Sequence, residues 1–160
     1  MSDTANTTVT VRPATAKDTA FLVSGNMAMA LETEGRRLDV QRLTFGVRAA
    51  LADASRGSYY IAEVGGRPAG QALVTREWSD WRNGWFWWLQ SVHVIPEHRR
   101  RGVFRAIYGY IADAARSAGD VCGLRLYVEQ ENTAALATYQ ALGMDVSGYR
   151  LCEHDWSAGS

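Results

Sequence analysis

The sequence lacks the features that mark several large classes of protein. Its 160 residues carry 17 basic and 17 acidic side chains and hence no net charge. A chain without a cationic surface is not expected to be a general nucleic-acid binder. No apolar run approaches the ~20 residues of a membrane helix, and the N-terminus lacks the basic-then-apolar pattern of a signal peptide. We therefore expect a soluble, cytoplasmic protein with no membrane or nucleic-acid partner.

Cysteine is scarce as well. Cys122 and Cys152 are the two cysteines, and they lie in apolar surroundings with no metal-ligand spacing. This pattern predicts reduced core residues and no metal site. The length suits one domain with a substantial core. We expect a single domain over residues 9–156, after a loose leader at 1–8, with no repeat or linker.

The first third of the chain predicts one strand and two helices. Alternating valines indicate a strand over 9–12. Thr15 and Asp18 have the spacing of a capping box, which would open a helix over about 16–30. After a polar loop at 32–37, Asp39 can cap a second helix, whose apolar residues recur at helical spacing. These residues are Val40, Leu43, Val47 and Leu51.

The middle of the chain changes to a period of two. It predicts a strand over Ser58–Val64, a tight turn at Gly65 and Gly66, and a second strand over Pro68–Trp78. A third strand follows over 85–95, after the turn signal Asn83-Gly84. We expect these three strands to form an antiparallel meander.

The segment after Pro96 indicates an anion site. Three arginines, Arg99–Arg101, precede Gly102, and an amphipathic helix follows. Its apolar stripe consists of Val103, Phe104, Ile107, Tyr108, Ile111 and Ala115. A helix start offers unpaired backbone N–H groups and the positive end of the helix dipole. The segment 98–105 therefore predicts a phosphate or pyrophosphate site, although a solvated basic turn would fit these residues equally well.

The last third predicts one strand, one helix and a tail. The helix that starts after Gly102 stops at Gly119, and a buried strand follows over 124–128. A crossover of this length implies parallel pairing with the strand at 85–95. Asn132 can cap a helix over Thr133–Leu142, and we expect one or two strands in the tail, 144–156.

Asn132 and Tyr139 are seven residues apart and share one face of this last helix. A tyrosine there could act as a general acid, because its ordinary pKa of about 10 keeps it protonated at neutral pH. A helix cap plus a core tyrosine is the simpler interpretation of the pair.

Together these residues resemble the GNAT family, the GCN5-related N-acetyltransferases. The resemblance is carried by Val92-His93-Val94-x-Pro96 followed by Arg99-x-x-Gly102, and by Asn132-x-x-Ala135-x-x-x-Tyr139-x-x-x-Gly143-Met144. The order of elements also matches that fold over roughly residues 8–156. The resemblance implies an α/β (α+β) fold with a mixed sheet of six to seven strands and about four helices. It also implies a splay between the strand at 85–95 and the strand at 123–129.

The resemblance implies acetyl-CoA as co-substrate. The pyrophosphate would bind the turn and helix start, whose residues are Arg99, Arg100, Arg101, Gly102, Val103, Phe104 and Arg105. The backbone of Val92, His93 and Val94 would pair with the pantetheine arm, and Asn132 would contact the coenzyme. Tyr139 would lie near the sulfur and protonate the departing thiolate. Phe104 stands where the family usually has a small residue, so we expect its side chain to point into the core.

The sequence leaves the general base open. Some family members use a glutamate on the central strand, but the aligned residue here is Trp88, which cannot accept a proton. The alternatives are His93, Glu77, Glu32 or a water relay ending on backbone carbonyls.

The acceptor site is suggested by aromatic residues. Five of the six tryptophans lie within residues 78–88. Trp78 and Trp81 flank a loop containing Asp80, and we hypothesise that this loop, with Glu32 or Glu34, lines a pocket for an amine. Gln90 is a further candidate. A surface loop folded on its own tryptophans is the alternative.

The leading hypothesis is an N-acetyltransferase that moves acetyl from acetyl-CoA directly to a primary amine of a small molecule or peptide. Two alternatives are an acyl-CoA-binding sensor without turnover and an enzyme that acetylates aminoacyl-tRNA. The balanced charge disfavours the last of these. Exposed strand edges are compatible with a homodimer.

Overall fold

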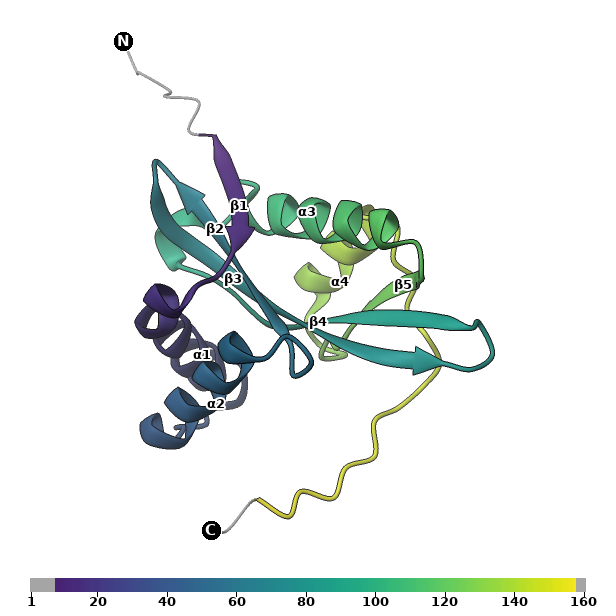
Figure 1. Ribbon diagram of the computed structural model, residues 1–160, viewed down its shortest axis with the longest axis horizontal. Coiled ribbons are helices and arrows are strands. Elements are labelled where there is room, and N and C mark those ends of the chain that lie inside the picture. Colours follow the sequence, from purple (N-terminus) through teal and green to yellow (C-terminus); the bar gives the residue numbers. More distant parts are fainter. Residues whose placement is uncertain (1–7, 158–160) are drawn as a thin grey trace. The chain divides into compact units, whose positions relative to one another are not determined.

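The computed structural model describes residues 8–157 (Figure 1). The chain divides into two compact units, one ending at Tyr127 and one beginning at Val128. In the first unit, the elements are β1 (Val9–Pro13), the 3-10 turn η1 (Ala16–Asp18), α1 (Thr19–Glu34), α2 (Val40–Ala52), β2 (Ser58–Val64), β3 (Arg67–Ser79), β4 (Gly84–Val94), the 3-10 turn η2 (Pro96–His98), α3 (Val103–Ala118) and β5 (Val121–Leu126). The second unit contains α4 (Thr133–Ala141).

One mixed sheet organises the first unit. Its strand order is β1-β2-β3-β4-β5. The first four strands pair antiparallel, and β4 and β5 pair in parallel. The predicted meander and the predicted parallel crossover are therefore confirmed.

Helix α3 packs on one face of this sheet through an apolar stripe (Figure 1). Val103, Ile107, Ile111 and Ala115 repeat every four residues, which places them on one side of the helix. All four are buried against residues of β2, β3 and β4, among them Ala72, Val74, Trp87 and Leu89. The predicted stripe is thus the main core of the protein.

Helices α1 and α2 pack on the other face. Their core is smaller and contains Leu22, Val23, Val47, Tyr59 and Ile61. The side-chain carboxylate of Asp39 accepts from the amide of Arg42 at 2.7 Å, so the predicted cap of α2 is confirmed.

Helix α1 is longer than we expected. It runs to Glu34, and Gly35 ends it in the left-handed conformation (φ 60°). Glutamate is a good helix former, so nothing interrupts the helix before this glycine. Glu32 and Glu34 therefore lie in the last helical turn, and the expected loop over 32–37 begins only at Gly35.

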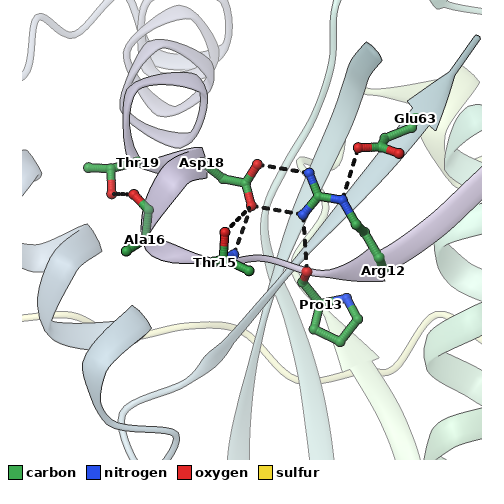
Figure 2. A network of polar contacts seen from close by, with 7 residues as sticks. All are labelled: Arg12, Pro13, Thr15, Ala16, Asp18, Thr19 and Glu63. Carbon is green, nitrogen blue, oxygen red and sulfur yellow. Dashed lines mark hydrogen bonds and ion pairs between the residues drawn. The ribbon is translucent and has the colours of Figure 1, made fainter. Parts of the chain in front are cut away.

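An ion-pair network fixes the start of α1 (Figure 2). The Arg12 guanidinium donates to both carboxylate oxygens of Asp18 at 2.8 and 2.9 Å, and to Glu63 at 2.9 Å. Asp18 also accepts from the amide of Thr15 at 2.7 Å, as the predicted capping box requires. Asp18 is buried, and its hydrogen bonds with Arg12 hold its pKa below the ordinary value.

The described chain has fewer strands than we expected. It contains five strands and four α-helices, and the prediction of six to seven strands is wrong. None of the described residues 144–157 forms a strand. The large apolar residues of this tail fall at even positions, Val146 and Trp156, and at odd positions, Tyr149 and Leu151. They therefore provide no consistent strand face.

Both cysteines are free, but neither lies in the core. Cys122 and Cys152 are exposed, so the expectation of buried cysteines is wrong. Cys122 lies in β5, next to the edge of the sheet, and its thiol is 3.4 Å from the carbonyl of Trp85. Residues 1–7 of the expected leader lie outside the described residues. Within the described part of the chain, no helix is long and apolar enough to cross a membrane.

Candidate functional site

The central strand β4 loses its neighbour halfway along its length. Its parallel pairing with β5 runs from Trp85 to Leu89 and stops there, where Leu89 is opposite Leu126. β4 itself continues to Val94. The second half of β4 therefore has an edge without strand pairing to β5, as the expected splay requires, and the predicted pantetheine residues 92–94 lie on this edge.

The unpaired half of β4 begins with a bulge. Register with β3 shifts by one residue, because Gln71 pairs with His93 whereas Leu73 pairs with Gln90. Ser91 has a φ of 50° there. The other two described non-glycine residues with left-handed backbone, Asn83 and Arg100, lie in turns. Ser91 is thus in a strained conformation inside a strand.

Polar side chains from four different elements meet at the bulge. We call them the bulge network: Asn26 of α1, Tyr59 of β2, Gln71 of β3 and Ser91 itself. Gln71 Nε2 donates to the Ser91 carbonyl at 3.2 Å, and Asn26 Nδ2 donates to the Tyr59 hydroxyl at 3.4 Å. Burial raises the pKa of Tyr59, while hydrogen bonds with Asn26 and the Ser91 side chain act in the opposite direction. Asn26, Tyr59 and Gln71 are buried, Ser91 is half-buried, and the network holds Ser91 by its carbonyl.

His93 follows the bulge and is also buried. Its Nε2 lies 3.5 Å from Arg99 Nη2, which binds Glu32 Oε2 at 2.8 Å. A guanidinium can only donate, so a hydrogen bond here requires Nε2 to accept and the ring proton to be on Nδ1, which has no hydrogen-bond partner among the described residues. Burial lowers the pKa of His93, the Arg99 charge lowers it further, and Glu32 opposes both. His93 is therefore neutral at neutral pH.

The turn from β4 into α3 contains two left-handed residues, Arg100 (φ 61°) and Gly102 (φ 79°). The amide of Ala106 bonds to the Gly102 carbonyl at 3.0 Å. The three helical amides before Ala106, those of Val103, Phe104 and Arg105, have no carbonyl four residues earlier within the helix. This end of α3 has the backbone geometry of an anion site.

The arginines of this turn divide into two groups. Arg99 points back toward α1, where it pairs with Glu32 and donates through Nε to the Val94 carbonyl at 2.9 Å. Arg100, Arg101 and Arg105 are exposed, and no hydrogen bond or ion pair within residues 8–157 engages their guanidinium groups. Three of the four predicted arginine side chains thus remain available to an anion.

Phe104 is only half buried, whereas we expected it in the core. Its ring centroid lies 6.2 Å from that of Tyr108, one turn later in α3. Val103 takes the buried position at the helix start instead. Phe104 lies beside the main apolar stripe because the core positions follow 103, 107 and 111 at a spacing of four.

Asn132 and Tyr139 belong to the second unit. Asn132 Oδ1 accepts from the amide of Ala135 at 3.1 Å and so caps α4. Tyr139 lies on the same helix, and burial raises its pKa. The tyrosine therefore stays protonated at neutral pH, and its hydroxyl can donate a proton.

The sheet face opposite α3 carries further aromatic and charged residues on β3, β4 and β5. Trp88 stacks on Tyr127 with ring centroids 4.5 Å apart, and Gln90 donates to the Thr75 hydroxyl at 2.6 Å. Glu77, a candidate base, is ion-paired with Arg125 at 2.5 Å. Gln90, the predicted acceptor residue on this face, is next to the bulge.

The predicted acceptor pocket does not assemble as proposed. Trp78 packs against Trp85 with ring centroids 4.9 Å apart, and Trp81 is 86% exposed at the tip of the β3–β4 hairpin. Glu32 lies near the other end of β4, where its partner Arg99 contacts Val94. This strand of 11 residues spans about 30 Å, so the tryptophans and Glu32 are far apart.

The sequence analysis did not identify Asn26, Tyr59 and Gln71 of the bulge network as functional residues. It also did not predict the left-handed conformation of Ser91. One signal was present. Gln71 interrupts the apolar run of β3, Ala69-Gly-Gln-Ala-Leu-Val74. A glutamine in such a run marks a buried amide that needs a partner. The described residues contain no cluster of metal ligands.

The family of the chain follows from comparison with known proteins. The family model described as "Acetyltransferase (GNAT) family" matches residues 27–144. The chain belongs to this family. It is therefore an acetyltransferase by family, and acetyl-CoA is the co-substrate that GNAT enzymes use, as the resemblance predicted. No curated protein sequence matches the chain.

Solved structures agree with this GNAT assignment. "A possible acetyltransferase from Clostridium difficile 630" is 41% identical, with a TM-score of 0.84 over 92% of this chain and 97% of that one. A predicted acetyltransferase from Clostridium acetobutylicum, solved with acetyl-CoA, is 17% identical, with a TM-score of 0.75 over 96% and 100%. The aminoglycoside N-acetyltransferase AAC(6')-Iy in complex with CoA is 14% identical, with a TM-score of 0.75 over 96% and 98%. The last two show a shared fold alone.

Proposed function

We propose that this GNAT protein transfers the acetyl group of acetyl-CoA to a primary amine of a small molecule or peptide, by direct attack in a ternary complex. One observation carries the proposal. The open edge of β4, with its bulge, leads through η2 and the turn at 99–102 into the amide-lined start of α3. This arrangement can hold an extended arm that ends in a phosphate.

The coenzyme would lie along this path. The amides of residues 101–105 would bind the pyrophosphate, helped by the free guanidinium groups of Arg100, Arg101 and Arg105. The backbone of Val92, His93 and Val94 would pair with the pantetheine amides as an added strand does. Asn132 would contact the coenzyme, and Arg99 would act through its contacts with Val94 and Glu32. Two proteins of the same fold were crystallised with acetyl-CoA or CoA, which supports a coenzyme on this fold but assigns no residue.

The transfer needs little chemistry beyond positioning. The amine nitrogen forms a bond to the thioester carbonyl carbon and loses one proton, the carbon–sulfur bond breaks, and the thiolate accepts a proton. Holding both reactants in one site supplies much of the rate. A backbone amide at the bulge would polarise the carbonyl, and Tyr139 would protonate the thiolate.

The ammonium proton of the acceptor must leave before attack. Glu32 and Glu77 are each paired with an arginine, and the Nε2 lone pair of His93 faces Arg99. Trp88 occupies the place of the family glutamate. Of the alternatives that the sequence left open, we therefore favour the water relay ending on backbone carbonyls.

The acid role of Tyr139 has its own test. Tyr139→Phe should lower kcat by roughly a hundredfold or more, as loss of a general acid does. The KM for acetyl-CoA should change little, because the ring remains. Equal kcat values for the variant and the native protein at saturating substrates would remove this role.

An acceptor screen tests the function as a whole. CoA release from acetyl-CoA is followed with a thiol reagent against polyamines, aminoglycosides, amino acids and short peptides. We expect at least one amine to raise release well above hydrolysis. Trp88 in place of a carboxylate favours a second candidate, an acyl-CoA sensor. Calorimetric binding of acetyl-CoA with no amine-dependent release would support the sensor.

A further inference from the structure

We propose that Gln71 is a positioning residue for acetyl transfer, because it holds the bulge of β4 in the conformation that presents the Val92 amide to the thioester. The inference rests on the proposed function. It assigns a role to a buried amide on β3 that neither the GNAT family match nor the sequence motifs include.

The peptide between Ser91 and Val92 sets the direction of the Val92 amide. Every peptide bond in the described chain is trans, so the carbonyl of Ser91 and the N–H of Val92 point in opposite directions. The Ser91 carbonyl accepts from Gln71, a side chain of β3. The Val92 amide is therefore directed away from β3, toward the side where β4 has no pairing with β5. On this side the thioester arm would lie.

The backbone of Ser91 is strained. Ser91 has a left-handed backbone inside a strand, which an L-residue adopts only when its surroundings enforce it. The bulge network supplies this enforcement, because Gln71 Nε2 donates to the Ser91 carbonyl and α1 packs on the Gln71 amide at Gly25. Without these contacts the peptide would be free to rotate, and the Val92 amide would lose its direction.

The buried side chain of Gln71 lowers the stability of the core. Its side chain is 0% exposed, and its Oε1 has no hydrogen-bond partner among residues 8–157. An unpaired buried amide oxygen costs free energy, so an apolar residue would suit the core better. Nε2 must face the Ser91 carbonyl, since Oε1 would repel it. The side chain is thus oriented for the bulge at a cost in stability.

Helix α1 is shaped to accept this amide. A Cβ atom at Gly25 would lie 2.1 Å from Gln71 Oε1 and 2.7 Å from its Cδ. Any other residue at position 25 would push the Gln71 amide away from its place. Gly25 therefore allows α1 to pack directly on Gln71 and keeps the amide pointed at Ser91.

Two variants test the proposal. Gln71→Met removes the donor and keeps similar volume, and Gly25→Ala keeps every polar group but displaces the amide. We expect each to lower kcat by roughly tenfold, since a displaced donor costs less than the hundredfold or more of a removed one. The KM for acetyl-CoA should change much less than kcat, because the phosphate contacts at the start of α3 and the backbone of Val94 lie outside the bulge. Gln41→Met, on the exposed side of α2, is the matched control and should behave as the native protein does.

A spectroscopic readout separates positioning from folding. The protein is saturated with acetyl-CoA carrying ¹³C at the acetyl carbonyl, and the ¹³C resonance reports the hydrogen bond to that oxygen. We expect the bound resonance of Gln71→Met to move toward that of free acetyl-CoA. If Gln71→Met does not fold, Gly25→Ala decides by the same two measurements.

Two results would overturn the proposal in different ways. A lower melting temperature with native kcat and a native ¹³C resonance would make Gln71 a stability residue only, and the proposed function would stand. Failure of the native protein to bind acetyl-CoA at all would overturn this inference and the proposed function together.

Discussion

Helices α1 and α3 pack on opposite faces of one sheet, and they do so by different physical means. α3 buries four apolar side chains at a spacing of four, and its interface with the sheet is built from aliphatic and aromatic carbon. α1 lays Asn26 and Gly25 over Tyr59 and Gln71, and an ion pair fixes each of its ends. The first interface is what a stable fold requires. The second includes buried polar groups, which reduce stability where they lack a hydrogen-bond partner, as Gln71 Oε1 does among the described residues.

The difference separates folding from chemistry. The polar contacts of α1 converge on the unpaired half of β4, where the bulge, His93 and the turn into α3 lie. An apolar interface there would pack as well, but it would not hold the Ser91 carbonyl. We therefore expect changes on the α3 side to alter stability, and changes on the α1 side near the bulge to alter turnover.

The largest effect on stability is expected at the centre of the α3 interface. Ile107 is fully buried. Ile107→Ala should lower the free energy of unfolding by about 2–5 kcal/mol, and Ile107→Val by about 0.5–1.5 kcal/mol. Urea unfolding followed by circular dichroism measures both. A larger loss of unfolding free energy for Ile107→Ala than for Ile107→Val, with native kcat for both folded variants, would support separate roles for the two faces of the sheet. A large drop in kcat would contradict them.

A smaller loss is expected where α1 begins. Asp18→Asn removes a buried carboxylate from Arg12 and should cost about 1–3 kcal/mol at pH 7. Hydrogen bonds with Arg12 lower the pKa of Asp18 in the folded state. The carboxylate therefore contributes its full stabilising free energy above its unfolded pKa of about 3.9. This free energy is lost as the pH falls from there through the lower pKa of the folded state. Urea unfolding at pH 7 and pH 3 should show a gap between native and variant that narrows in acid.

The exposed carboxylate of Asp113 on α3 offers a control for Asp18. Asp113 pairs with Arg116, and both side chains are largely exposed. Asp113→Asn should change stability by about 0.5 kcal/mol or less at either pH. If the Asp18→Asn gap were the same at pH 3 as at pH 7, the Arg12 pair would not be its cause.

A weaker effect than that of Asp18→Asn is expected where α1 ends. Glu32 and Arg99 are 45% and 43% exposed, so Glu32→Gln should cost about 0–1 kcal/mol. The loss should shrink in 0.5 M salt, because exposed pairs are screened. Glu34→Gln, in the same helical turn, is the control. A loss of several kcal/mol that salt does not change would show that this pair is more than a surface contact.

Sequence reasoning captured the α3 side well. Alternating residues and the Gly65-Gly66 turn located β2 and β3, and the stripe from Val103 to Ala115 located α3. These features follow from local periodicity, and periodicity is what a single sequence contains. The anion site at the start of α3 stays a prediction, which rests on the arginines, Gly102 and the helix start rather than on periodicity.

The α1 side was largely missed for a physical reason. Asn26, Tyr59, Gln71 and Ser91 come from four elements, and only the packed sheet brings them together. The left-handed conformation of Ser91 leaves no mark in the sequence, because serine is not the residue that such a backbone favours. The sequence predicted helix α1, but the predicted helix ended at about residue 30, whereas α1 runs to Glu34. The tryptophan pocket failed because Trp81 and Glu32 lie toward opposite ends of one strand.

We propose that one face of the sheet stabilises the fold of this acetyltransferase and that the other face positions its reaction. The most direct test measures two quantities, the free energy of unfolding and kcat at saturating acetyl-CoA and amine, for Ile107→Ala and Gln71→Met. The account predicts that Ile107→Ala loses stability and keeps kcat, whereas Gln71→Met loses about tenfold in kcat without a matching loss of stability. If kcat followed stability in the same way for both variants, the two faces would not differ and the account would be wrong.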